Sequence, residues 1–315
     1  MSAKRLAGVD IGTLTCRLLI ADVPERGPLN ELHSERRILR LGEGVDGTGG
    51  LAEPAMERVI RCLIDWRRVI EDYRVSGMTA VATSAVRDAN NRFEFLERIR
   101  REAGFSVEIL SGEEEAHRTM LGIRAGLPEG RDDVLAIDIG GGSTEFIRAR
   151  KDGSLHARSV DIGVVRLCER MLRHDPPTDE EVRSARRWIR ESVLNALSNF
   201  PSQGCRGFVG TAGTITSLAA MAQGLSRYEP ARIHNYRLTL DAIVGLETKL
   251  LALSSANRAG LPGLEKGREE VIAAGAIIIR TIMETLGETI CLVSDAGLRE
   301  GVIIHLGMQP TGMEM

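Results

Sequence analysis

The chain has 315 residues, enough for two domains that each bury a core. Its 43% hydrophobic and 27% charged residues are typical of an ordinary soluble globular protein. The net charge of -3 excludes an overall electrostatic footprint for nucleic acid, so we expect no nucleic-acid partner. An anionic substrate would need local basic patches, and Arg36, Arg37 and Arg40 form one candidate.

The five cysteines are scattered and form no Cys-x-x-Cys pair, which argues against a disulfide scaffold or a zinc site. They predict free thiols in a reducing compartment, so we expect a cytoplasmic protein. No apolar stretch reaches about 18 residues without a charge, and the N-terminus shows no signal-peptide core. We therefore expect no membrane association.

Apolar periodicity and turn residues divide the first half of the chain into strands and helices. Short apolar runs predict strands at 6–10, 18–22, 80–83 and 107–110. Helices are expected at 52–71, at 91–103 and from Ser111 to about residue 122, where Ser111 and Glu114 resemble a capping box. Residues 126–132 are the expected linker.

The second half repeats this alternation. Strands are expected at 134–138, 145–149, 155–160, 207–210 and 289–294. Helices are expected at 178–197, where Thr178 and Glu181 would cap the start, and at 214–222, 241–253, 271–286 and 298–306. Alternating strands and helices predict an α/β protein. Because 7–13 and 135–141 share an apolar-Asp-Ile-Gly core and each opens one half, we expect two similar domains whose hairpins face a shared cleft.

The most informative segment follows the strand at 134–138. Asp138 ends that apolar run, and Gly140, Gly141 and Gly142 follow almost at once. Three adjacent glycines let the backbone approach a ligand closely, and their N–H groups with the Ser143 hydroxyl can form an anion nest. A carboxylate beside such a nest suits a divalent cation that travels with phosphate. The segment therefore predicts a metal–phosphate site.

A partial copy of this segment lies near the N-terminus. Asp10 is followed by Gly12, which permits a tight turn, by the hydroxyls of Thr13 and Thr15, and by Arg17, which can bind phosphate. An ordinary hairpin with Asp-x-Gly turn chemistry is the alternative. The second copy at Asp138 favours the functional interpretation.

A third candidate lies where a strand ends and a helix begins. Gly210, Thr211 and Gly213 occupy this junction, and helix N-termini bind anions through free N–H groups. A simple helix cap is the alternative. A dinucleotide-binding fingerprint is disfavoured, because the glycine spacing does not match it.

Two further side chains are ambiguous from the sequence. Glu115 belongs to an acidic first helical turn, which complements the helix dipole, yet a fixed carboxylate there is also a plausible general base for water. Arg87 follows a buried strand closely, where it suits either an anion or a surface ion pair.

Taken in order, these motifs resemble those of the actin, sugar-kinase and chaperone-ATPase superfamily. Within it, the chain resembles the exopolyphosphatase / guanosine pentaphosphate phosphohydrolase (Ppx/GppA) family from about residue 5 to 303. The segments that carry this resemblance are 40–46, 82–87, 109–116, 136–145, 261–264 and 267–276.

The resemblance implies two ribonuclease-H-like (actin-like ATPase) domains with mixed sheets, flanking helices and an active site in the cleft between them. The first domain would comprise 1–125 plus about 298–315, because the family's last helix crosses back, and the second 126–297. The resemblance implies hydrolysis of a terminal phosphoanhydride in polyphosphate or in the guanosine pentaphosphate pppGpp, with Mg²⁺ (or Mn²⁺). A homodimer is a family-level expectation.

The family's functional residues transfer by position. Glu115 would be the general base, and Glu145 would assist catalysis. The metal would be held by Asp10, Asp138 and Glu145. Phosphate would be bound by Gly12, Thr13, Arg17, Arg87, Gly140, Gly141, Gly142, Ser143, Gly210, Thr211, Gly213 and Arg268.

The chain departs from the family pattern in three ways. Leu14 replaces an asparagine of the first phosphate motif, and Glu269 and Glu270 follow Arg268 where Ala-Asp is usual. The chain also ends at residue 315, without the helical region of longer members, which favours short chains or a nucleotide as substrate.

Two alternative functions are open. One is a nucleotide-dependent kinase or ATPase of the same superfamily, which would leave polyphosphate untouched. The other is a sensor that binds guanosine tetra- or pentaphosphate or polyphosphate without turnover. The presence of Glu115, Asp138 and Glu145 argues against a pure sensor.

Overall fold

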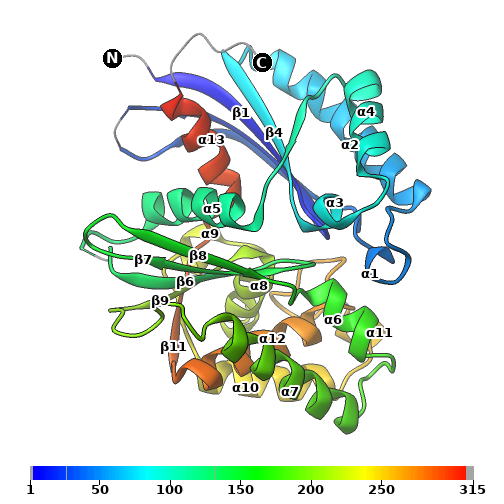
Figure 1. The fold of residues 1–315 in the computed structure, drawn as a ribbon, viewed down its shortest axis with the longest axis vertical. Helices are drawn as coiled ribbons and strands as arrows, with labels where there is room; N and C mark the ends of the chain where they lie inside the picture. The colour runs from blue at the N-terminus through cyan, green and yellow to red at the C-terminus, as the bar shows by residue number, and fades with distance from the viewer. Residues whose placement is uncertain (1–2, 26, 131, 310–315) are drawn as a thin grey trace. The chain divides into compact units, whose positions relative to one another are not determined.

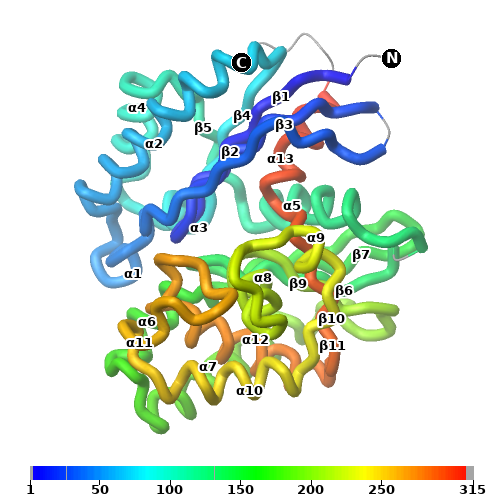
Figure 2. The backbone as a smooth tube through the Cα atoms, turned by 180° about the vertical axis from the view of Figure 1, so that it is seen from behind, coloured from blue at the N-terminus to red at the C-terminus, as the bar shows by residue number. Residues whose placement is uncertain are grey.

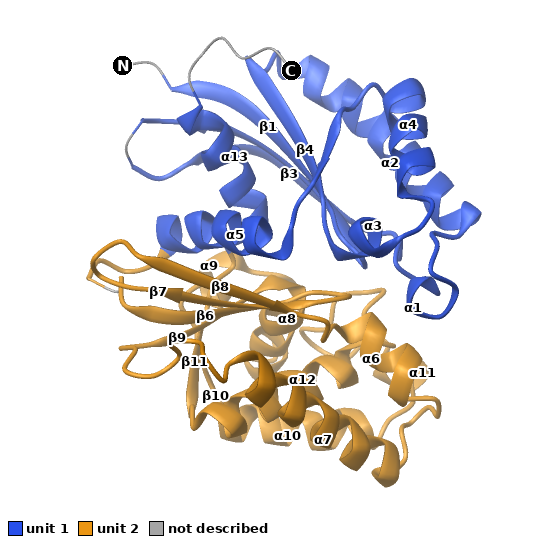
Figure 3. Cartoon of the chain, viewed as in Figure 1, with its two compact units in different colours: residues 1–126, 296–315 blue, residues 127–295 orange. Residues whose placement is uncertain are grey.

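The computed structural model describes residues 3–25, 27–130 and 132–309. The chain forms two compact units (Figure 3): unit 1 runs to Gly126 and resumes at Ala296, and unit 2 spans Leu127–Asp295. Residues 1–2 and 310–315, which the sequence assigns to the first domain, lie outside the described residues, as does Arg131 of the expected linker.

Unit 1 is built on a mixed sheet. Its strands are β1 (Lys4–Ile11), β2 (Thr15–Val23), β3 (Asn30–Ile38), β4 (Gly77–Ala82) and β5 (Val107–Ile109). Its helices are α1 (Val45–Thr48), α2 (Glu53–Asp72), α3 (Ser84–Asp88), α4 (Arg92–Ala103), α5 (Gly112–Gly126) and α13 (Leu298–Met308). The strand order is β3-β2-β1-β4-β5, with β2 antiparallel to both β1 and β3, and with β4 and β5 parallel to β1.

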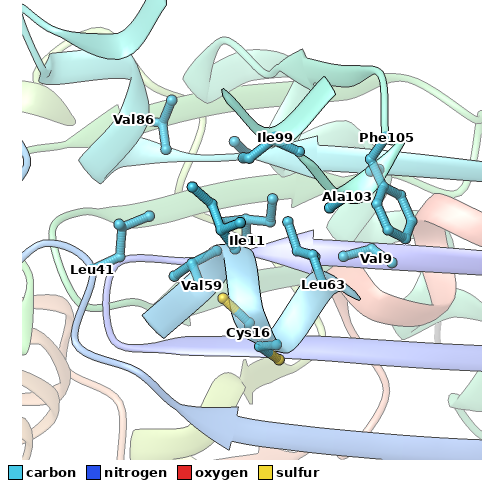
Figure 4. Packing of buried hydrophobic residues seen from close by; sticks show 14 of the residues in the cluster. Val9, Ile11, Cys16, Leu41, Val59, Leu63, Val86, Ile99, Ala103 and Phe105 are labelled. Carbon is cyan, nitrogen blue, oxygen red and sulfur yellow. The ribbon is translucent and has the colours of Figure 1, made fainter. Parts of the chain in front are cut away.

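Helices cover both faces of this sheet (Figure 1). Successive side chains of a strand point to opposite faces. Val9, Ile11 and Cys16 belong to the core that α2 and α4 cover, where Val59 and Leu63 pack among them (Figure 4). On the opposite face α13 packs against β1 and β2 through a separate apolar cluster. The sheet is therefore buried on both sides.

Two glycines set the distance between α5 and α13. A Cβ atom on Gly122 would lie 1.9 Å from the carbonyl oxygen of Gly297, and one on Gly301 would lie 1.7 Å from that of Arg118. Any larger residue would push the helices apart. Because α5 carries Glu115 in its first turn, this close crossing fixes Glu115 relative to the sheet.

Unit 2 is built on a second mixed sheet. Its strands are β6 (Val134–Ile139), β7 (Thr144–Ala149), β8 (Leu155–Val160), β9 (Phe208–Thr211), β10 (Arg237–Thr239) and β11 (Ile290–Val293). Its helices are α6 (Val164–Met171), α7 (Asp179–Ala196), α8 (Ala212–Ala222), α9 (Pro230–Ile233), α10 (Leu240–Leu251), α11 (Ser255–Arg258) and α12 (Ile272–Leu286). Helix α8 contacts β6, β9 and β11, and α10 and α12 pack on α8 (Figure 2).

The two sheets share one topology. The order β8-β7-β6-β9-β11 in unit 2 repeats β3-β2-β1-β4-β5 of unit 1, with the same pattern of antiparallel and parallel neighbours. Strand β10 is an addition beside β11. The α/β class with two mixed sheets and flanking helices, which the Asp-Ile-Gly repeat and the resemblance predict, is confirmed.

Two of the elements that the sequence pattern misses illustrate why it fails. Strand β3 is polar and charged along most of its length, so it lacks the apolar alternation that identifies a strand, and it pairs only with β2. Helix α6 has only eight residues, too few for a clear helical period, and follows Gly163 directly. By contrast, the predicted capping boxes of α5 and α7 are both present.

Two expectations from composition can be compared with the structure. All five cysteines are free thiols, as predicted. In the part of the chain that the structure describes, we find no helix with the length and apolar character required to cross a membrane.

Candidate functional site

The predicted site residues gather at the carboxyl ends of parallel strands within each unit. In unit 1 the ends of β1, β4 and β5 align, with Ile11 beside Ala82 and Ala82 beside Ile109. In unit 2 the ends of β6 and β9 align, with Asp138 beside Thr211. Ligands of open α/β sheets bind at this edge.

The β1–β2 hairpin holds the first motif in a tight turn. The Gly12 N–H donates to the Thr15 carbonyl oxygen at 3.1 Å. A Cβ atom on Gly12 would lie 2.8 Å from that oxygen, so the turn requires glycine. Asp10 and Arg17 are directly opposite each other, and Arg17 approaches the Asp10 carboxylate at 3.5 Å.

Asp10 is the most constrained carboxylate of this hairpin. It is 4% exposed, and its Oδ1 atom has no hydrogen-bond partner among the residues that the structure describes. Burial raises the pKa of Asp10, while the adjacent Arg17 opposes the rise. An orphaned buried oxygen costs free energy unless a proton, a donor or a cation reaches it, so Asp10 is suited to bind one of these.

The tip of the same hairpin is locked by its neighbours. The Thr13 hydroxyl lies 2.8 Å from that of Ser84, the first residue of the short helix α3 that carries Arg87. The Gly42 N–H donates to the Thr13 carbonyl at 2.8 Å, and the Leu14 carbonyl accepts from the backbone that follows β3. The Leu14 side chain, which replaces an asparagine of the family's first motif, is buried.

Glu114 and Glu115 are neighbours in the first turn of α5 but have different surroundings. Glu114 accepts from the Ser111 N–H at 2.9 Å and from the Ser111 hydroxyl at 2.8 Å, and these bonds lower the pKa of Glu114. Glu114 is therefore the helix cap. Glu115 points inward and is 7% exposed.

Glu115 and Arg87 form an ion pair that the sequence does not reveal. The Arg87 guanidinium lies 3.1 Å from the Glu115 carboxylate and also donates to the Leu110 carbonyl at 2.9 Å. The surface ion pair considered for Arg87 is therefore replaced by a largely buried one. The predicted base and a predicted phosphate ligand are in direct contact.

The β6–β7 hairpin repeats the geometry of the first. The Gly140 N–H donates to the Ser143 carbonyl at 3.0 Å. The backbone at Gly163 lies so close that a Cβ atom there would be 2.2 Å from the Gly141 carbonyl oxygen. The first N–H groups of α6 donate to the Gly140 and Gly141 carbonyls at 2.9–3.3 Å. The Gly140 and Gly141 carbonyls therefore point toward the start of α6, and these hydrogen bonds hold the glycine loop in place.

Asp138 and Glu145 are directly opposite each other in this hairpin. Both are buried, Glu145 to 1% exposure, and the Ser159 hydroxyl donates to Glu145 at 2.7 Å. Like charges directly opposite in a sheet are unfavourable. A divalent cation would relieve this repulsion, and carboxylate oxygens are the ligands that Mg²⁺ prefers.

The carboxylates do not form a complete metal cage. Across residues 3–25, 27–130 and 132–309, no group of three or more His, Cys, Asp or Glu side chains is placed to hold a metal ion. Mg²⁺ usually binds proteins through one or two carboxylates, with water and substrate phosphates completing the shell. The Asp138–Glu145 pair fits that mode.

Arg166 lies beside the candidate site, and the motif analysis does not identify it. Its Nε donates to the Gly142 carbonyl at 2.8 Å, so a guanidinium lies beside the glycine loop. The available signal is weak: a glycine after a strand followed by a short apolar run containing one arginine. Because α6 itself was not predicted, Arg166 had no expected position.

The third motif has strained backbone at the β9–α8 junction. Ala212 has φ of 72°, a left-handed conformation that side chains rarely adopt. The Gly210 carbonyl accepts from the Ser294 N–H at 2.8 Å. A Cβ atom on Gly210 would lie 2.6 Å from the Cys291 sulfur, so Gly210 is required for core packing at least.

Arg268 lies directly on this motif. A Cβ atom on Gly213 would be 2.1 Å from one terminal nitrogen of the Arg268 guanidinium and 2.7 Å from the other. Arg268 is 4% exposed. The structure therefore brings together two predicted phosphate ligands that are far apart in the sequence, Gly213 and Arg268.

The candidate basic patch of Arg36, Arg37 and Arg40 is not a single surface. Arg36 and Arg37 are neighbours in β3 and therefore point to opposite faces. Arg37 pairs with Asp65 at 2.9 Å and with Glu35 at 3.3 Å. Arg17 on β2 lies directly opposite Arg36 on β3 and Asp10 on β1, so these three residues share one face of the sheet.

Known proteins of one family match nearly the whole chain. The model of the Ppx/GppA phosphatase family matches residues 19–308. The chain is 36% identical to Exopolyphosphatase 2 of Mycobacterium tuberculosis over 318 aligned positions, covering 97% of this chain and 99% of that protein.

Solved structures of similar proteins have the same fold. One exopolyphosphatase-like protein superposes with a TM-score of 0.90 at 30% identity, covering 96% of this chain and 98% of the other. The Ppx/GppA family member of Aquifex aeolicus superposes with a TM-score of 0.81 at 34% identity, covering 98% and 99%. The chain therefore belongs to the Ppx/GppA phosphatase family.

Proposed function

We propose that this protein releases the terminal phosphate of inorganic polyphosphate, converts pppGpp to ppGpp, or does both, by attack of water on the terminal phosphorus. Glu115 is the general base. The observation that carries this proposal is the buried contact of Glu115 with Arg87, because it places a fixed carboxylate beside a cation suited to phosphate. The Glu114 cap leaves Glu115 available for this role.

Polyphosphate is the first substrate to test. The similar M. tuberculosis protein is named as an exopolyphosphatase and aligns over nearly its whole length. The alternative pppGpp presents the same terminal phosphoanhydride, so the same residues can act on it. The shared chemistry is a terminal phosphoryl group whose leaving group is itself a phosphate.

Phosphate binding in this proposal uses backbone N–H groups and arginines. The Gly140–Ser143 loop, held by α6, presents a concave backbone to an anion. Arg17 and Arg87 supply cations in unit 1, and Arg268 supplies one beside Gly213 in unit 2. Preorganised donors of this kind stabilise the charge that develops on the equatorial oxygens.

Asp138 and Glu145 would hold Mg²⁺ (or Mn²⁺), with Ser159 orienting Glu145. The orphaned Oδ1 of Asp10 is a further oxygen suited to a cation or its water. The metal, when bound, supplies positive charge that neutralises the phosphate oxygens. The protein residues orient the phosphate and the attacking water, and Glu115 accepts the water proton.

The test is phosphate release from polyphosphate, pppGpp and ATP, measured side by side on the purified protein with Mg²⁺. The proposal predicts orthophosphate from polyphosphate or pppGpp without an acceptor. ATP turnover that depends on an added acceptor, with polyphosphate untouched, would instead indicate a kinase. Tight binding of polyphosphate or pppGpp without release, measured by calorimetry, would indicate a sensor.

A further inference from the structure

A buried arginine, Arg258, binds the backbone of the segment that carries Arg268. Arg258 is 2% exposed, and its guanidinium donates to the Glu269 carbonyl and the Leu250 carbonyl, each at 3.0 Å. Asp175 lies 3.6 Å from the same guanidinium. Arg258 therefore ties the backbone next to Arg268 to the C-terminal end of α10.

A second contact fixes the Arg268 side chain itself. Its Nε donates to the Glu265 carboxylate at 2.8 Å, and its backbone N–H donates to the Glu265 carbonyl at 3.1 Å. A guanidinium is a rigid planar fork. Holding Nε therefore sets the plane and the direction of both terminal nitrogens, which lie against Gly213.

The Nε–H and the terminal N–H groups of Arg268 therefore have different neighbours. Nε–H is committed to Glu265, whereas the terminal N–H groups are at the third phosphate motif. Bidentate contact with phosphate needs two N–H groups in a fixed orientation. The carboxylate thus preorganises Arg268 and does not need to touch the substrate.

We propose that Glu265 is a positioning residue, which determines phosphate affinity by fixing the plane of the Arg268 guanidinium. This inference rests on the proposed function, because it takes Arg268 as a phosphate ligand. It assigns the effect to the hydrogen bond from Nε and not to the charge of Glu265. Glu265→Gln keeps an acceptor oxygen at the same reach, whereas Glu265→Ala removes it.

The experiment measures calorimetric binding of tripolyphosphate with Mg²⁺, in an E115Q background that prevents its hydrolysis. We expect E265A to weaken binding about tenfold, since hydrogen bonds to charged groups are worth about that much. E265Q should stay within about threefold of the reference. In an R268M background E265A should have no further effect, because the two residues act through one contact.

A matched control is Glu180, whose contact with Arg183 has the same three-residue spacing and an N···O distance of 2.8 Å on the surface of α7. E180A should leave tripolyphosphate binding unchanged. Melting temperatures without ligand show whether each variant is folded. If E265A does not fold, E265D withdraws the carboxylate and should weaken binding in the same way.

Three results are distinguishable. If the E115Q protein binds no tripolyphosphate, the proposed function fails and the inference fails with it. If it binds and R268M binds equally well, Arg268 is not a phosphate ligand. If R268M weakens binding but E265A does not, or if E265Q weakens it as much as E265A, the positioning role of Glu265 is overturned.

Discussion

The β1–β2 and β6–β7 hairpins are built alike but differ in the charge of the residue opposite the aspartate. Each turns through one glycine N–H bond, from Gly12 to Thr15 at 3.1 Å and from Gly140 to Ser143 at 3.0 Å. Each has an aspartate two residues before that glycine. The residue directly opposite is Arg17 for Asp10 but Glu145 for Asp138.

We propose that this difference suits the two hairpins to different tasks. In unit 1 the arginine opposite the aspartate would supply a donor for an anion. In unit 2 the glutamate opposite the aspartate would make the pair suited to a cation. In this proposal one cross-strand position separates anion binding from cation binding on the same backbone.

Neither hairpin holds the proposed base, and the largest expected effect tests that separation. Glu115→Gln keeps the size of the side chain and an acceptor for Arg87, but it cannot accept a proton from water. We expect kcat for tripolyphosphate to fall by about 10²- to 10⁴-fold with little change in binding. Phosphate release and calorimetry on the same sample measure both quantities. Near-normal turnover would exclude Glu115 as the base.

Glu145→Gln tests the cation side of the comparison. Removing one of the two opposed carboxylates should lower the affinity for Mg²⁺ and so raise the half-saturating Mg²⁺ concentration. At a fixed Mg²⁺ concentration kcat should fall by about 10- to 100-fold. A Mg²⁺ titration of phosphate release measures the shift in the half-saturating concentration. The comparison variant is Arg17→Gln in the other hairpin, which should shift that concentration much less than Glu145→Gln does. Equal Mg²⁺ dependence in both variants would mean that the hairpins are not specialised.

Arg17→Gln tests the anion side. The variant loses a cation that lies 3.5 Å from Asp10 and faces the first phosphate motif. We expect KM for tripolyphosphate to rise about tenfold, because a charge-assisted contact is lost. Initial rates over a range of substrate concentrations give KM. An unchanged KM in a folded variant would show that Arg17 only neutralises Asp10.

The smallest effect concerns the pH dependence of stability. Burial raises the pKa of Asp10 above its ordinary 3.8, so the folded protein binds this proton more tightly than the unfolded chain. The unfolding free energy of wild type relative to D10N should therefore fall as pH rises from 3.8 to the folded pKa, by at most about 1.4 kcal/mol per pH unit. Urea unfolding at several pH values measures this. A difference that grows with pH would contradict it.

Local sequence signals predict the fold well because each depends on neighbouring residues. The Asp-Ile-Gly repeat predicts two similar halves, and the Ser111 and Thr178 capping boxes mark real helix starts. Local sequence signals fail where a strand or helix forms mainly because of its contacts with other parts of the chain. Strand β3 has no apolar alternation of its own, and α6 is identified mainly by its packing on the glycine loop.

The sequence names a set of candidate site residues but does not predict the contacts between them. Arg87 and Glu115 lie 28 positions apart, and nothing in either segment indicates that they pair. Arg268 reaches Gly213 only through the tertiary packing of unit 2. Both contacts join residues that are far apart in the sequence. Apolar periodicity describes only residues that are close in the sequence, so it cannot predict these pairings.

Hydrolysis of tripolyphosphate in ¹⁸O-labelled water tests the central claim most directly, because it follows the oxygen that attacks phosphorus. The account predicts that the released orthophosphate carries the solvent oxygen, that the pyrophosphate product does not, and that both products disappear in E115Q. Unlabelled orthophosphate, label in the pyrophosphate, or phosphate transferred to an added acceptor would contradict attack of water on the terminal phosphorus.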